Sequence, residues 1–142
     1  MYSVPVRCEP HGVIGELKGV LRLDGVNLSL QYQIADRILH EFRSAPVDLA
    51  FAPASLVEAR MFGGFLGLAP GLELRVAEIQ ALSALPAQEP GRLRLRVRFS
   101  DRRDARRIVD GINSICAEQR LARLDASIDA LQAPLRAPRD NS

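Results

Sequence analysis

Residues 92–99 read RLRLRVRF, and residues 100–116, SDRRDARRIVDGINSIC, follow them directly. In the first stretch arginines alternate strictly with apolar residues, which is the period of a strand with one buried and one solvated face. Beyond Ser100 and Asp101, both common N-cap types, the apolar period lengthens to that of a helix. The sequence therefore predicts an antiparallel sheet whose last strand leads into an amphipathic C-terminal helix.

Short strand patterns fill the chain ahead of residue 92. Residues 15–23 and 26–34 alternate on either side of Asp24-Gly25, a dipeptide that favours a type I′ hairpin turn. Residues 1–14 contain two prolines and a glycine and are interpreted as an irregular or edge-strand lead-in. Further strands are predicted over 47–51, 56–62, 65–68 and 72–76, while 36–43 and 79–85 are ambiguous.

Length and composition fit one domain. The 142 residues are 47% apolar and carry a net charge of +2, so the chain can bury a sufficient core without disulfides or a structural metal. We expect a barrel over about 13–99, a helix over about 101–132 stopped by Pro134, and a disordered tail over 134–142. No apolar run approaches the ~20 residues of a membrane span. The chain is therefore expected to be cytoplasmic, with a peripheral membrane location left open.

The order of these elements resembles the pleckstrin-homology-like fold, and its bacterial members in particular. The residues that carry the resemblance are the hairpin GELKGVLRLDGVNLSLQYQ, the last strand GRLRLRVRFSD and the helix DARRIVDGINSI. It covers roughly residues 13–117 and implies an antiparallel barrel, or two orthogonal sheets, of about seven strands capped by the helix. The chain has no Trp, which the eukaryotic domains carry in that helix. Only Lys18 and Arg22 stand where those domains carry their headgroup-binding pattern, so phosphoinositide recognition is not implied.

Arginine supplies 18 of the 19 basic side chains, and ten of them lie between residues 92 and 123. Guanidinium groups can hold phosphates bidentately, so this segment is a candidate site for anionic lipid or phosphate groups. The candidate residues are Arg92, Arg94, Arg96 and Arg98 on the strand and Arg103 at the helix start. The alternative is a solvated outer face whose arginines pair with acids such as Glu73 and Asp101. The low net charge and 5% aromatic content argue against specific nucleic-acid binding.

Signals for other chemistry are weak. Cys8 and His11 form a C-x-x-H pair that His40 and Cys116 could complete, but a zinc site normally has paired ligands at both ends. We interpret Cys116 as a core residue and Cys8 as a free thiol. No catalytic signature or phosphate-binding loop is present. The sequence thus predicts a protein that is not an enzyme and needs no metal or cofactor.

Two apolar features lack an expected partner inside the domain. The hairpin at 61–68 could expose Phe62, Phe65 and Leu66, although alternation could equally bury most of them. Farther on, a helix ending near residue 132 would be about 48 Å long, which exceeds the mouth of a small barrel. Either the chain bends near Arg120 and folds back, or the stripe after residue 117 packs against another chain. That stripe is Leu121, Leu124, Ile128 and Leu131.

These features together predict a non-catalytic protein-interaction or oligomerisation module. Its partner would be a second copy of itself, as a homo-oligomer, or another protein. Binding of an anionic surface through the arginine face is the alternative function.

Overall fold

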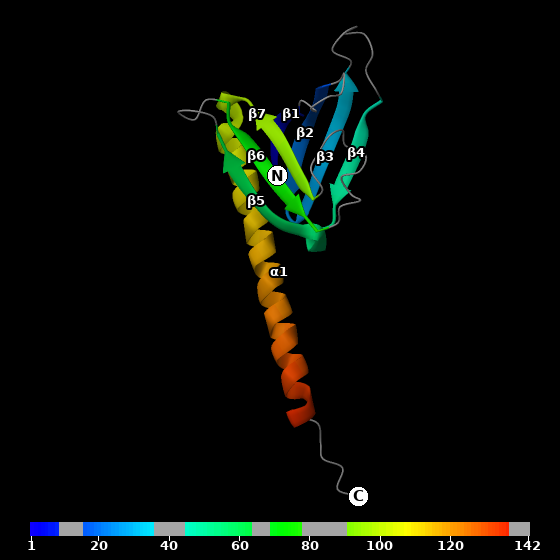
Figure 1. The fold of residues 1–142 in the computed structure, drawn as a ribbon, viewed down its shortest axis with the longest axis vertical. Coiled ribbons are helices and arrows are strands. Elements are labelled where there is room, and N and C mark those ends of the chain that lie inside the picture. Colours follow the sequence, from blue (N-terminus) through cyan, green and yellow to red (C-terminus); the bar gives the residue numbers. More distant parts are fainter. Residues whose placement is uncertain (9–15, 36–44, 64–68, 78–90, 137–142) are drawn as a thin grey trace, which may run out of the picture.

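A computed structural model describes residues 1–8, 16–35, 45–63, 69–77 and 91–136, with side chains as far as residue 132 (Figure 1). The strands are β1 (Tyr2–Cys8), β2 (Glu16–Asp24), β3 (Asn27–Ala35), β4 (Val47–Phe51), β5 (Leu56–Phe62), β6 (Gly71–Val76) and β7 (Arg92–Val97). Two short 3-10 turns, η1 (Pro53–Ser55) and η4 (Phe99–Asp101), precede β5 and the single long helix α1 (Arg102–Arg136).

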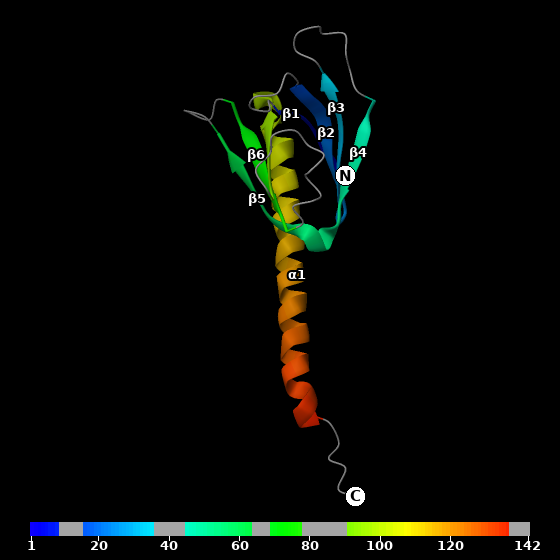
Figure 2. The same ribbon diagram turned by 45° about the vertical axis from the view of Figure 1, so that its right-hand side comes forward.

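The seven strands form one antiparallel sheet in the order β4-β3-β2-β1-β7-β6-β5. This confirms the predicted class of a β-sheet followed by a C-terminal helix. The sheet is not closed into a barrel, because β4 and β5 remain its two unpaired edges within the described residues. It is instead bent so that these edges lie on two separate arms joined below by η1 (Figure 2).

Strand β1 corrects the prediction for the start of the chain. Residues 2–8 form a central strand, paired along its whole length with β2 and with β7 at Val6 and Arg7. The expected lead-in rested on two prolines and a glycine in residues 1–14, and of these only Pro5 lies in the strand, where it cannot donate a ladder hydrogen bond. Pairing with β7 begins only after Pro5, so the proline lies outside that ladder. The sheet therefore starts at Tyr2 rather than near residue 13.

The first hairpin turns one residue later than predicted. Asp24 pairs directly with Asn27, which leaves Gly25 and Val26 as the two loop residues. Gly25 has a φ of +60° while Val26 does not have a positive φ, a combination that fits a turn needing glycine only at its first central position. From Leu28 onward, the residues predicted to be buried still lie on the buried face, so the two strands keep the predicted alternation.

One face of the sheet and the first half of α1 make the core. The alternating apolar residues of β1, β2, β3, β6 and β7 are buried on this face, and α1 lies against it. The buried helix residues are Ala105, Ile108, Val109, Ile112, Ile115 and Cys116. Their spacing is that of one helix face, as the sequence pattern predicted.

The helix also covers the free edge of β5. The side chain of Asn113 accepts a hydrogen bond from the Ala59 N–H at 3.0 Å and donates one to the Ala59 carbonyl at 2.9 Å. About two turns farther on, the Arg120 guanidinium donates to the carbonyl of Val57 at 3.2 Å. These contacts satisfy backbone groups that an edge strand would otherwise leave open for pairing.

Beyond Cys116 the helix continues past the sheet without bending (Figures 1 and 2). Its 35 residues correspond to about 52 Å. The chain therefore does not fold back near Arg120, and the first of the two alternatives is wrong. The helix ends at Arg136, a few residues later than predicted, so Pro134 lies in its last turn and not beyond its end. The predicted tail lies mostly outside the described residues.

Candidate functional site

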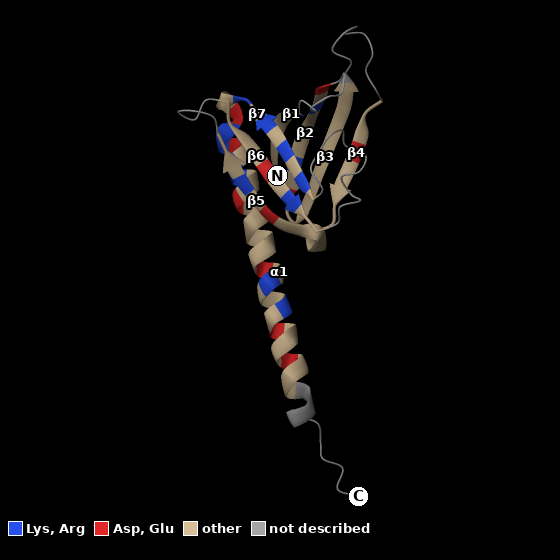
Figure 3. Ribbon diagram, in the orientation of Figure 1, with Lys and Arg blue, Asp and Glu red and all other residues tan. Residues whose placement is uncertain are grey.

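The predicted arginine stripe lies on the sheet face opposite the core. Arg94 and Arg96 alternate with buried Leu93, Leu95 and Val97 on β7, and basic residues follow again at the start of α1 (Figure 3). The strands beside β7 divide this polar face into two halves of different electrostatic character. On the β6 side Arg94 faces Glu73, although Arg92 faces Arg75, and on the β1 side Arg96 faces the basic Arg7.

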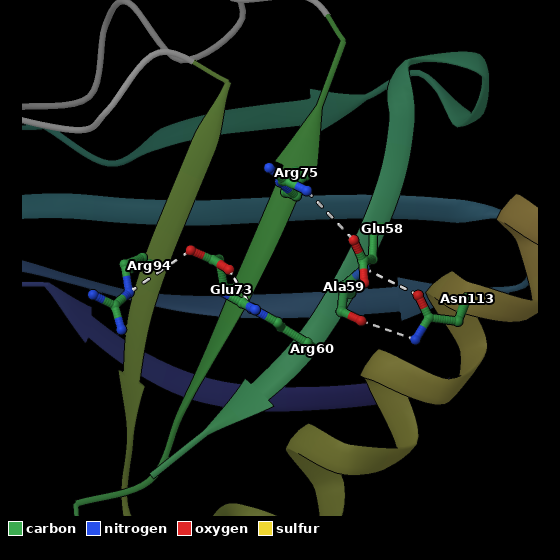
Figure 4. A network of polar contacts seen from close by, with 7 residues as sticks. All are labelled: Glu58, Ala59, Arg60, Glu73, Arg75, Arg94 and Asn113. Atoms are coloured by element: carbon green, nitrogen blue, oxygen red, sulfur yellow. Dashed lines mark hydrogen bonds and ion pairs between the residues drawn. The ribbon is translucent and has the colours of Figure 1, made fainter. Parts of the chain in front are cut away.

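The β6 half is paired. The carboxylate of Glu73 is only 3% exposed, with the Arg60 Nε at 2.5 Å and the Arg94 Nε at 3.9 Å (Figure 4). Beside it, Arg75 lies 3.7 Å from the carboxylate of Glu58. This half of the stripe therefore fits the alternative reading of a solvated face with cross-strand pairs.

Phe62 belongs to the same polar face. Its ring lies so close to Gly71 that a Cβ added at this glycine would clash with the ring. The guanidinium of Arg94 stacks on the ring at 4.3 Å and that of Arg96 at 5.4 Å from the centroid. Phe62 is thus half-buried by its own sheet, while Phe65 and Leu66 lie outside the described residues.

The β1 half brings basic side chains together. Arg7 stands directly opposite Arg96 on one side and directly opposite Lys18 on the other. These residues line an open pocket together with Arg98, whose Nε lies 2.7 Å from the Asp101 carboxylate. Arg7 and Lys18 were not among the sequence-predicted residues. Only the strand register reveals them, because they lie about 80 to 90 residues from Arg96 in sequence.

Arg103 lies apart from this row. It lines a second open pocket at the helix start, with Met61, Phe62, Gly63 and Pro70 on the other side. Its neighbour Arg102 stacks on the ring of Phe99 at 4.0 Å. Arg92 ends up at the far end of β7, opposite Arg75. Arg96 and Arg98 thus share the pocket on the β1 side, whereas Arg92, Arg94 and Arg103 have other neighbours, so the five predicted arginines do not form one continuous site.

The protruding helix segment carries the other predicted site. Leu121, Leu124, Ile128 and Leu131 are 62%, 58%, 48% and 76% exposed. At 3.6 residues per turn, this stripe lies about 140° around the helix from the core-facing residues. The rotation arises at one step of five residues, from Cys116 to Leu121, where the preceding spacing was three or four. The stripe is therefore a separate apolar face and does not continue the domain core.

The cysteines behave as buried core residues. Neither Cys8 nor Cys116 forms a disulfide, and both are buried. Burial raises the pKa of the Cys116 thiol, and the nearby Arg120 charge opposes this only partly. Within the described ranges, no group of three or more His, Cys, Asp or Glu is placed to hold a metal ion. His11 and His40 lie outside those ranges.

In the part of the chain that the structure describes, no helix is long and apolar enough to cross a membrane. Comparison with protein-family models, with curated proteins and with solved structures yields no match for this chain.

Proposed function

We propose that this chain is a pleckstrin-homology-like self-association module, in which the protruding helix of one copy pairs antiparallel with that of a second copy. The observation that carries the proposal is the exposed stripe of Leu121, Leu124, Ile128 and Leu131 on a helix face turned away from the sheet. A helix with a free apolar stripe is stabilised when another helix covers it.

The stripe is suited to a second copy of itself because it is symmetric about residue 126. Leu121 and Leu131 lie five residues on either side of this point, and Leu124 and Ile128 lie two on either side. A two-fold axis there sets each leucine of the outer pair against its counterpart and each Leu124 against an Ile128. The segment beyond the core, residues 117–136, has nearly the same midpoint, so the whole segment would be covered.

An antiparallel pair also suits the position of the sheet. The sheet lies beside the N-terminal half of α1 only, and the C-terminal half projects from it (Figure 2). Parallel pairing would bring two sheets side by side at the same end of the helices. Antiparallel pairing holds the two sheets at opposite ends of the helix pair. The C-terminal end of each helix then reaches the level of the partner's Cys116. It lies on the side of the partner's helix that faces away from the partner's core.

The exposed fractions indicate a weak dimer. Together they amount to about two and a half side chains of apolar surface per protomer. At about 2 kcal/mol for each fully buried side chain, covering them on both protomers gains about 10 kcal/mol. Association costs at least about 4 kcal/mol in lost freedom. We therefore expect a dissociation constant in the micromolar range or weaker.

Sedimentation equilibrium of the full chain from about 5 to 500 µM tests the proposal. The wild-type chain is expected to form dimers, and Leu124→Glu is expected to remain monomeric because it places a charge at the centre of the pair. The matched control is Ala126→Glu, which adds the same charge at an exposed position on the opposite side of the helix. A wild-type monomer at every concentration, or equal loss in both variants, would overturn the proposal.

Spin labels at Gln132→Cys determine the orientation. In the antiparallel pair residue 132 lies beside the partner's residue 120, so the two labels are about 18 Å apart along the axis. A parallel pair would place them side by side. Dimers with adjacent labels would therefore contradict the antiparallel arrangement.

A further inference from the structure

We propose that the row Lys18, Arg7 and Arg96, which crosses β2, β1 and β7, binds a ligand that carries two adjacent phosphate groups. The register places Lys18 directly opposite Arg7 and Arg7 directly opposite Arg96. All three side chains are exposed on the polar face of the sheet. The row is thus a continuous line of three positive charges over three neighbouring strands.

Such a row is unfavourable in the free protein. Like charges that face each other on adjacent strands repel, and stable sheets place opposite charges there. On the β6 half of the same face, Glu73 lies between Arg60 and Arg94, and Arg75, which faces Arg92, has the Glu58 carboxylate at 3.7 Å. Among the described residues, by contrast, no carboxylate lies within ion-pair distance of Arg7 or Lys18. The charges of Arg7 and Lys18 are therefore not neutralised by any described carboxylate, and an external anion would neutralise them.

The shape around the row suits a bound anion. Arg7, Lys18, Arg96 and Arg98 surround an open pocket of about 480 Å³, to which Pro5, Val6 and Gly19 also contribute. Two arginines of the pocket are already oriented: Arg96 donates to the Ala69 carbonyl at 3.0 Å, and Arg98 donates to the Asp101 carboxylate. Each keeps further N–H groups for a ligand. Counting Asp101, the pocket carries a net charge of about +3.

The spacing of the row indicates the size of the ligand. Neighbouring strands are about 4.8 Å apart, so the three positions span roughly 10 Å. A single phosphate can contact Arg7 and one flanking residue, whereas a diphosphate can contact all three. Guanidinium groups bind such oxygens through paired, charge-assisted hydrogen bonds. A soluble diphosphate and a phosphorylated lipid headgroup both offer this chemistry.

Titration calorimetry of the full chain with inorganic pyrophosphate, at low and at physiological salt, tests the site. Pyrophosphate is expected to bind about tenfold more tightly than inorganic phosphate, and Arg7→Gln is expected to lower its affinity about tenfold. The matched control is Arg22→Gln on β2, which removes the same charge from the same face where Arg22 faces Ser3 and Ser29. The affinity of Arg22→Gln for pyrophosphate is expected to fall less than about threefold.

A second arm separates the two phosphate sources. Vesicles that contain a lipid with phosphomonoester groups are tested for binding, with pyrophosphate as competitor. If the protein binds these vesicles, and if both pyrophosphate and the Arg7→Gln substitution abolish the binding, the lipid occupies the same site. The phosphates of the ligand are then assigned to a lipid. Pyrophosphate binding without vesicle binding assigns them to a soluble ligand. Absence of binding to both probes at low salt, or equal loss in Arg7→Gln and Arg22→Gln, overturns the proposal.

Thermal unfolding separates binding from a structural role. Because the row is repulsive, ligand-free Arg7→Gln is expected to unfold at the same or a higher temperature than the wild type, and to lose the rise that pyrophosphate causes. A lower unfolding temperature with undiminished pyrophosphate binding would mean that Arg7 is structural, and would overturn the assignment. Leu124→Glu is expected to bind pyrophosphate normally, so the site and self-association are tested independently.

Discussion

The two hydrogen bonds between Asn113 and the backbone of Ala59 fix α1 along the edge of β5, and Asn113→Ala removes both. The side chain uses its carbonyl oxygen and its amide group on the two backbone groups of one residue, at 3.0 and 2.9 Å. No other side chain type of this size offers one acceptor and one donor in that arrangement. The substitution therefore tests whether the helix is anchored by this polar clamp or by apolar packing alone.

The expected loss follows from the burial of the two partners. Each hydrogen bond contributes about 1 kcal/mol net, and an unsatisfied buried backbone group costs about 1–3 kcal/mol. Ala59 is 2% exposed, so water has little access to it. Asn113 itself is exposed, so water can partly replace it from the outer side. We therefore expect a loss of about 2–3 kcal/mol in the free energy of unfolding, or roughly 6–10 °C in Tm for a chain of this size.

Urea unfolding followed by circular dichroism at 222 nm measures this loss, since the chain has no Trp for fluorescence. Ser114→Ala is the matched control, because Ser114 is the next, exposed residue of the same helix. Its stability is expected to change by less than about 0.5 kcal/mol. A loss of the same small size in Asn113→Ala would refute the reasoning and assign the anchoring to the apolar helix face.

Two further predictions concern buried groups. Glu73→Gln keeps the shape of a 3% exposed side chain but removes the charge that attracts Arg60 and Arg94; a loss of about 1–2 kcal/mol in urea unfolding is expected, and an unchanged midpoint would contradict it. The pKa of the Cys116 thiol is raised by burial, so native protein is expected to resist iodoacetamide at pH 8 and to react after unfolding. The same shift contributes stability that is present below the ordinary thiol pKa of 9.0 and is lost as pH rises above it, which unfolding curves at pH 8 and 10 can detect.

Local periodicity explains why much of the fold was predictable. The alternation in 92–99 and the change to helical spacing after Ser100 each involve residues within a few positions of one another. The structure confirms the strand as far as Val97, the helix that follows, and the strands at 47–51 and 56–62. Phe99, which the alternation places on the buried face, instead begins the turn η4 and is 51% exposed. The errors arose where local rules compete with tertiary context. Pro5 is unfavourable in a central strand in general, but it is tolerated here because β7 does not pair with it.

The orientation of the protruding stripe was also present in the sequence, in the five-residue step from Cys116 to Leu121. Successive spacings of three and four residues keep an apolar stripe on one side of a helix. A step of five residues moves the next apolar residue more than a quarter turn around the helix axis, away from that side. Such a step is a local signal that a helix changes partners. It predicts a face directed away from the core, which the 62% exposure of Leu121 bears out.

The basic row could not be predicted in this way, because its members are neighbours only through the register. Positions 7, 18 and 96 belong to three strands, and a shift of one residue in either pairing would move one side chain to the apolar face. The sequence stripe was assigned to β7 alone because its period is visible there. Charge on one strand says little about binding, since the neighbouring strand decides whether that charge is neutralised. Arg94 beside Glu73 and Arg96 beside Arg7 are two residues apart on β7, and they differ in this respect.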